Sequence, residues 1–89
     1  MNDSEIQEHL TKLAGWKHQG NSLVKEFNFS NFMESMAFVN KIASKAEEMG
    51  HHPVLLIEYS KVTVTLTTHD SGGVTQKDFD LALIIDQIN

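Results

Sequence analysis

The stretch VLLIEYSKVTVTLT, residues 54–67, decides the fold, because apolar and polar side chains alternate along both of its halves. Alternation with a period of two is typical of β-strands that bury one face. The Ser60-Lys61 pair predicts a two-residue turn, which pairs Tyr59 with Val62 in an antiparallel hairpin. A slip of one residue would set Glu58 against Val62, which burial of that face forbids. The face that we expect to be buried carries Leu55, Ile57, Tyr59, Val62, Val64 and Leu66.

The rest of the chain supplies a second hairpin and three helices. Residues 16–29 predict a hairpin that turns at Gly20-Asn21. N-capping signals begin each predicted helix, and the helices with their caps are residues 4–15 (Ser4, in a capping box with Gln7), 30–50 (Ser30 or Asn31) and 75–88 (Thr75). The order α-β-β-α-β-β-α predicts an α+β fold in which helices cover one face of a four-stranded antiparallel sheet.

The longest predicted helix, residues 30–50, has apolar side chains at helical spacing. We expect these side chains to face the core or another subunit: Phe32, Met36, Val39, Ala43 and Ala46. Gly50 stands where a left-handed C-cap is expected.

Composition excludes several classes of protein. The 89 residues predict one domain, residues 1–89, and the absence of cysteine excludes disulfides, zinc–thiolate sites and thiol catalysis. Twelve acidic against seven basic residues give a net charge of -5, which disfavours a nucleic-acid or anionic-membrane surface. The first residues lack a signal-peptide pattern and no run approaches the ~20 apolar residues of a membrane span, so we expect a cytoplasmic protein.

Two adjacent histidines, His51 and His52, lie between Gly50 and Pro53. The hairpin register, carried outward, brings His52 opposite His69, so that three histidines converge at one end of the sheet. Because Pro53 forces His52 into an extended conformation, the two neighbouring rings must point in different directions. Histidines that converge in this way suit acid/base chemistry near neutral pH.

Two carboxylates are expected near this cluster. Glu47 precedes His51 by four residues and can bond its imidazole across the last helical turn, or it can be half of an exposed acidic pair with Glu48. Asp78, at the start of the last helix, is by default a capping residue. A zinc site of three histidines and a carboxylate is the rival interpretation, but adjacent histidines on an extended chain chelate one ion poorly and no His-Glu-x-x-His spacing occurs.

The spacing of these residues resembles a family signature. From Glu47 the chain has three residues, His51-His52-Pro53, five residues, Tyr59, nine residues, His69, eight residues and Asp78. This string, together with GW, KEFNFSNF and AFVNKIA upstream, is similar to the pterin-4a-carbinolamine dehydratases, also called 4a-hydroxytetrahydrobiopterin dehydratases. The chain departs from vertebrate-type members at Val54-Leu55, where those carry Asn-Trp.

The resemblance implies a lyase that removes water from 4a-hydroxytetrahydrobiopterin to give quinonoid dihydropterin, with no metal or organic cofactor. It implies His51, His69 and Glu47 as catalytic residues and His52 and Asp78 as substrate-binding residues. On this basis we expect His51 and His69 to share the acid and base roles, while Glu47 and Asp78 set the charge and position of the histidines. It further implies a homodimer or homotetramer and a functional link to an aromatic amino acid hydroxylase. The alternative is a non-catalytic pterin-binding or protein-interaction module on the same scaffold.

Overall fold

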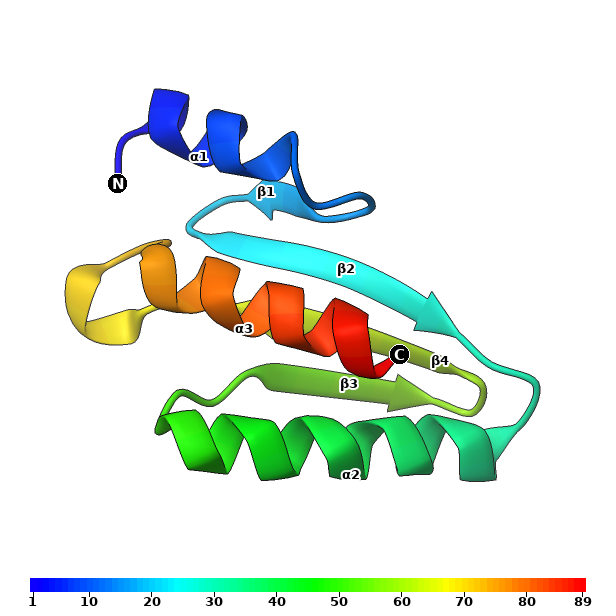
Figure 1. Cartoon of the computed structure of the whole chain (residues 1–89). Coiled ribbons are helices and arrows are strands. Elements are labelled where there is room, and N and C mark those ends of the chain that lie inside the picture. Colours follow the sequence, from blue (N-terminus) through cyan, green and yellow to red (C-terminus); the bar gives the residue numbers. More distant parts are fainter.

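The fold is a four-stranded antiparallel sheet with three α-helices (Figure 1). The computed structural model describes residues 1–89. Its helices are α1 (Asp3–Leu10), α2 (Phe32–Met49), the short 3₁₀ helix η1 (His69–Ser71) and α3 (Gln76–Ile88). Its strands are β1 (Lys17–Gln19), β2 (Ser22–Asn28), β3 (Val54–Glu58) and β4 (Lys61–Leu66). The predicted order of elements and the predicted α+β class are confirmed.

The strands follow one another in the sheet as β1-β2-β4-β3, so β2 and β4 are central and β3 is an edge strand. β2 and β4 are buried on one face only, where Leu23 lies opposite Leu66 and Phe27 lies opposite Val62. None of the α-helices combines the length and the apolar character that a bilayer crossing requires.

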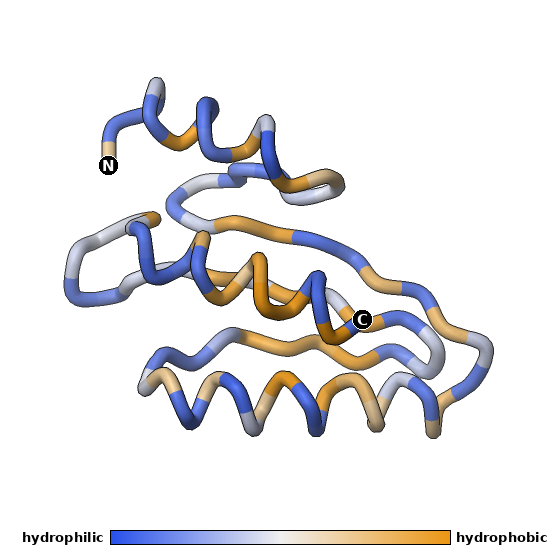
Figure 2. Tube along the Cα trace, viewed as in Figure 1, coloured by the Kyte–Doolittle hydropathy of each residue, from blue (hydrophilic) through white to orange (hydrophobic).

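The hydrophobic core lies between this face and helices α2 and α3, and α3 crosses in front of the sheet (Figure 1). Hydrophobic residues follow α3 and the strands in the hydropathy view (Figure 2). Fully buried side chains that meet in the core include Leu23, Val62 and Val64 from the strands and Ile42, Leu81 and Ile85 from the helices. Burial of such side chains is the main stabilising term of the fold, at roughly 1.5–3 kcal/mol for each.

The second hairpin has the predicted faces but not the predicted register. Ile57, not Tyr59, pairs with Val62, and the turn is formed by Tyr59 and Ser60 between the paired residues Glu58 and Lys61. Tyr59 adopts a left-handed conformation with φ of 56° and is 67% exposed, so it does not contribute to the core face. Because the register is shifted by two residues, the side chains of the predicted faces other than Tyr59 stay on those faces.

The α2 stripe is buried only in part, and the predicted limits of α1 are wrong. The inward face of α2 carries Ser35, Phe38, Ile42 and Ala46. Of the expected stripe, Ala46 therefore faces the core, whereas Phe32 and Ala43 are exposed and their contact with another subunit stays a prediction. Helix α1 is capped by Asn2 in a capping box with Glu5, not by Ser4, and it ends at Leu10. After Leu10 the chain continues as turns, and Leu13 is buried within this segment.

Three predicted helix boundaries are confirmed. Asn31 caps α2 and its side chain accepts a hydrogen bond from the backbone N–H of Glu34. Gly50 closes α2 with φ of 65°, a conformation that glycine adopts without the steric cost of a Cβ atom. Thr75 caps α3 in a capping box with Asp78.

The predicted loop 69–73 contains the short helix η1 and leads directly to Thr75. The left-handed cap of α2 and the start of α3 both lie at the end of the sheet where the histidines are found.

Candidate active site

A cavity of about 330 Å³ lies at this end of the sheet, and His51, His52 and His69 all line it. Its other lining residues are Gly50, Thr67, Thr68, Asp70 and Lys77. The volume is at the lower end of the range for small-molecule sites. No hydrophobic side chain lines this cavity, so a ligand would be recognised there through hydrogen bonds.

The three histidines converge by a route that differs from the predicted one. In the observed register β3 begins at Val54 and β4 ends at Leu66, so His52 and His69 are not strand partners. His51 and His52 follow the left-handed cap of α2, and His69 begins η1 after β4. The loops that follow two different elements therefore supply the histidines of one cavity.

His51 is held by Asp78. The Nε2 atom of His51 lies 2.6 Å from Oδ1 of Asp78, and the two side chains are 12% and 0% exposed. The backbone N–H of His51 donates to the carbonyl oxygen of Ala46, which fixes where the residue leaves the helix. A short hydrogen bond to a fully buried carboxylate fixes the orientation of the ring.

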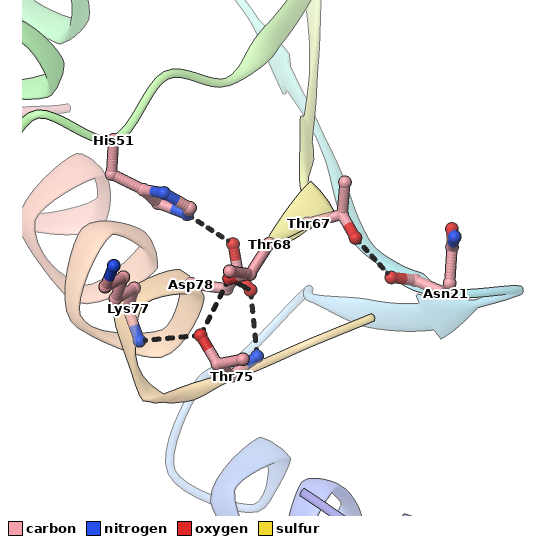
Figure 3. Close-up of polar contacts among 7 residues, drawn as sticks. All are labelled: Asn21, His51, Thr67, Thr68, Thr75, Lys77 and Asp78. Atoms are coloured by element: carbon pink, nitrogen blue, oxygen red, sulfur yellow. Dashed lines mark hydrogen bonds and ion pairs between the residues drawn. The ribbon is translucent and has the colours of Figure 1, made fainter. Parts of the chain in front are cut away.

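Asp78 is itself held by two donors, Thr68 and Thr75, and by the contact with His51 (Figure 3). Its Oδ2 atom accepts from the hydroxyl of Thr68 at 2.7 Å and from the backbone N–H of Thr75 at 2.9 Å, while Oδ1 faces His51. Asp78 is fully buried and is not among the residues that line the cavity, so a direct contact between Asp78 and substrate stays a prediction. Its place behind His51 agrees with the expectation that it positions this histidine.

Glu47 contacts a different histidine from the predicted one. Its Oε1 atom lies 2.7 Å from Nε2 of His52, and no hydrogen bond joins it to His51. The predicted spacing of four residues presumes a continuous helix, but α2 ends at the left-handed Gly50 before His51 is reached. The two side chains are 81% and 63% exposed, so this ion pair lies in solvent at the rim of the cavity.

His69 differs from the other two histidines because its ring makes no hydrogen bond within the chain. It is exposed and lines the cavity, so both of its ring nitrogens are free for a ligand. No three histidine, aspartate or glutamate side chains lie close enough together to hold a metal ion. The site therefore contains His51 bonded to a buried carboxylate, His52 in an exposed ion pair and His69 without a partner. Such a set of imidazoles is suited to proton transfer.

Sequence reasoning missed Thr68 and Lys77. Thr68 is buried and holds Asp78, and Lys77 is the only lysine or arginine that lines the cavity. A signal for Thr68 is present in the sequence, because the buried alternation Val62, Val64, Leu66 reaches its first polar residue at Thr68. For Lys77, a helical position next to Asp78 was the only available indication.

Comparisons with known proteins identify the family of this chain. The family described as Pterin 4 alpha carbinolamine dehydratase matches residues 1–88. A protein of Trichormus variabilis, whose name assigns it provisionally as a pterin-4-alpha-carbinolamine dehydratase, is 54% identical over 89 residues, covering 100% of this chain and 96% of that protein.

Two solved structures have a similar fold. A transcriptional coactivator/pterin dehydratase from Brucella melitensis superposes with a TM-score of 0.95 at 33% identity, covering 99% of this chain and 96% of that one. A pterin dehydratase-like protein identified as a RuBisCO assembly factor in the alpha-carboxysome superposes with a TM-score of 0.71 at 27% identity, covering 83% and 88%. The match over nearly the whole chain shows that this protein belongs to the pterin-4-alpha-carbinolamine dehydratase family.

Proposed function

We propose that this protein dehydrates 4a-hydroxytetrahydrobiopterin to quinonoid dihydropterin in the cavity lined by His51, His52 and His69. The observation that carries the proposal is that His51 and His69 share one cavity while making different contacts, in a chain of this family. The pterin ring system carries donors and acceptors around its edge, which suits a cavity without hydrophobic walls.

The chemistry requires two proton transfers. A carbinolamine carries a hydroxyl group and an amine nitrogen on the same carbon. Dehydration breaks the C–O bond and forms a C=N double bond, so the departing oxygen gains a proton and the nitrogen loses one. The reaction therefore uses one proton donor and one proton acceptor, with no net change in protons. Histidine performs both tasks near neutral pH, and each positioned group contributes roughly 10²–10⁴ in rate.

The contacts support a division of labour among the site residues. His51 and His69 share the acid and base roles, because both line the cavity and neither is tied up in an exposed ion pair. His52 orients the pterin from the rim, with Glu47 holding its ring. Asp78 holds His51 from behind. The product would return to the tetrahydropterin pool that an aromatic amino acid hydroxylase consumes.

We also propose that the protein works in the cytoplasm as a homodimer or homotetramer. Exposed apolar side chains on α2 and on the edge strand β3 support self-association, among them Phe32, Met33, Val54 and Leu56. Light scattering coupled to size-exclusion chromatography measures the mass of the particle in solution, and a monomer at micromolar concentration would contradict this part of the proposal.

The second candidate is a non-catalytic pterin-binding or protein-interaction module. A structural neighbour at 27% identity is described as a RuBisCO assembly factor, so the scaffold also serves assembly in at least one protein. The two candidates differ in turnover. Chemically prepared 4a-hydroxytetrahydrobiopterin is mixed with the protein and its decay is followed by stopped-flow absorbance against buffer alone. Acceleration supports the dehydratase, whereas pterin binding at the buffer rate supports the module.

A further inference from the structure

The hydroxyl groups of buried Thr68 and partly buried Thr75 form a chain whose donors and acceptors can be assigned one by one (Figure 3). The hydroxyl of Thr68 has a single proton, and it donates this proton to Oδ2 of Asp78 at 2.7 Å. The oxygen of Thr68 also lies 2.7 Å from the hydroxyl oxygen of Thr75. Because the proton of Thr68 is already committed, Thr75 is the donor in this second contact.

The other hydrogen bonds of Thr75 agree with its role as the donor to Thr68. The oxygen of Thr75 accepts from the backbone N–H of Lys77 at 3.3 Å, so its own proton remains available for Thr68. The backbone N–H of Thr75 donates to Oδ2 of Asp78 at 2.9 Å, which fills that oxygen together with Thr68. Every hydrogen bond in the chain therefore runs toward the carboxylate of Asp78, and no buried side-chain polar atom is left without a partner.

The direction of the chain supports an assignment of the ring proton of His51. The side chain of Asp78 accepts both of its hydrogen bonds at Oδ2, and an ionised carboxylate accepts at Oδ1 as well. The 2.6 Å contact between Oδ1 of Asp78 and His51 therefore requires a proton on Nε2 of the ring. In the neutral ring the other nitrogen, Nδ1, then carries the lone pair, and it has no partner in the chain.

We propose that Thr68 and Thr75 are positioning residues that, through Asp78, hold His51 with its proton on Nε2 and leave Nδ1 as the atom that accepts a proton from the ligand. This assignment rests on the proposed function, and it makes His51 the base of the reaction. Nδ1 of His51 takes the proton from the carbinolamine nitrogen as the C=N bond forms. His69, whose ring has no partner, is left to protonate the departing hydroxyl, which leaves as water.

The test compares two substitutions that separate shape from hydrogen bonding. Thr68→Val keeps the branched shape of the buried side chain and removes the hydroxyl, whereas Thr68→Ser keeps the hydroxyl and removes the methyl group. Thr65→Val is the matched control, because Thr65 lies on the outward face of β4, three residues before Thr68, and its side chain makes no hydrogen bond. Circular dichroism and thermal unfolding establish that each variant is folded.

The first readout needs no substrate. Nitrogen-15 NMR of the free protein near pH 8 locates the ring proton of His51, which Asp78 protects from exchange with solvent. We expect the Nε2–H resonance in wild type, Thr68→Ser and Thr65→Val, and its loss through faster exchange in Thr68→Val. A proton on Nδ1 in wild type overturns the proposal, even where Thr68→Val does not fold. A resonance that Thr68→Val leaves unchanged overturns it as well.

The second readout is turnover. Removing one hydrogen bond to a buried charged group lowers kcat about 10-fold in Thr68→Val, and Thr68→Ser stays near wild type. Loss of the ring resonance without a loss of turnover would contradict the positioning role. Because the NMR readout uses the free protein, absence of dehydratase activity in every variant would refute the proposed function without changing the result on the ring proton.

Discussion

Nε2 of His51 lies 2.6 Å from Oδ1 of Asp78, although the two residues are 27 positions apart in the chain. One belongs to the loop after α2 and the other to the first turn of α3. The contact therefore joins the loop after one helix to the start of another, at the end of the sheet where the cavity lies. It gives Asp78 a task beyond capping, since the same carboxylate ends the hydroxyl chain from Thr75 and Thr68.

Asp78→Asn is expected to lower both turnover and stability. The amide keeps the shape of the side chain but carries no charge, so its bonds to His51 and Thr68 lose their charge-assisted character. We expect kcat to fall about 10- to 100-fold and the free energy of unfolding to fall by about 1.5–3 kcal/mol. Steady-state kinetics and urea unfolding measure the two effects. The control is Asp80→Asn, because Asp80 is exposed two positions along the same helix and bonds only Gln76. Equal effects at both positions would contradict the account.

The ion pair of Glu47 and His52 is expected to affect ligand binding and not stability. Both side chains are more than half exposed, and such surface pairs contribute about 0–1 kcal/mol to stability. Glu47→Gln and His52→Gln should each raise KM by about 3- to 10-fold, and the double variant should match the larger single effect because the residues act as one unit. Glu48→Gln is the control, since Glu48 forms only a surface ion pair with Lys45, at 3.8 Å. Additive effects in this cycle would show that the two residues act independently.

A second polar cluster, far from the cavity in sequence, is expected to stabilise the fold without affecting turnover. Nζ of Lys25 donates to Asp86 and to the carbonyl oxygen of Ala14, both at 2.9 Å, and the indole N–H of Trp16 also donates to Asp86. Lys25→Met leaves a half-buried carboxylate with only the indole as partner, so unfolding free energy should fall by about 1–2 kcal/mol.

Urea denaturation measures this effect, and kcat per folded molecule should stay unchanged. Lys45→Met is the matched control, because the Lys45–Glu48 pair is exposed and its loss should cost less than about 0.5 kcal/mol. A Lys25→Met protein as stable as the control would show that the cluster contributes nothing.

Tyr59→Asn is expected to stabilise the protein by about 0.5–1 kcal/mol. Tyr59 adopts φ of 56°, a conformation that costs an ordinary side chain free energy and that asparagine tolerates. Its ring is largely exposed, so little packing is lost. Tyr59→Ala has the same backbone cost and should not stabilise. Thermal unfolding of both variants provides the measurement, and a more stable Tyr59→Ala would contradict the explanation.

The sequence pattern of the second hairpin predicts which faces of its strands are buried, but it does not predict how the strands pair. Alternation fixes which face of a strand is buried, but a shift of two residues keeps every side chain on its face. The sequence therefore could not distinguish a Tyr59–Val62 register from the observed Ile57–Val62 register. The turn decides the register, and a tyrosine at positive φ is not a residue that a turn rule selects.

The expected inward face of α2 and the expected partner of Glu47 differ from the structure for other physical reasons. Helix α2 carries apolar residues on more than one face, so spacing alone allowed Phe32 as well as Phe38 to be the inward residue. The predicted contact between Glu47 and His51 assumed helical geometry beyond Gly50, where the helix has already ended. The convergence of the three histidines did not depend on either detail, because both loops emerge at the same end of the sheet.

The most direct test of the central claim is the dehydration rate of His51→Gln and His69→Gln proteins, measured by stopped-flow absorbance with 4a-hydroxytetrahydrobiopterin. His18→Gln is the control, since His18 lies outside the cavity. The account predicts that each cavity variant loses at least about 100-fold in kcat and that the control keeps wild-type activity. A His51→Gln or His69→Gln protein that turns over within about threefold of wild type would contradict acid/base catalysis by these residues.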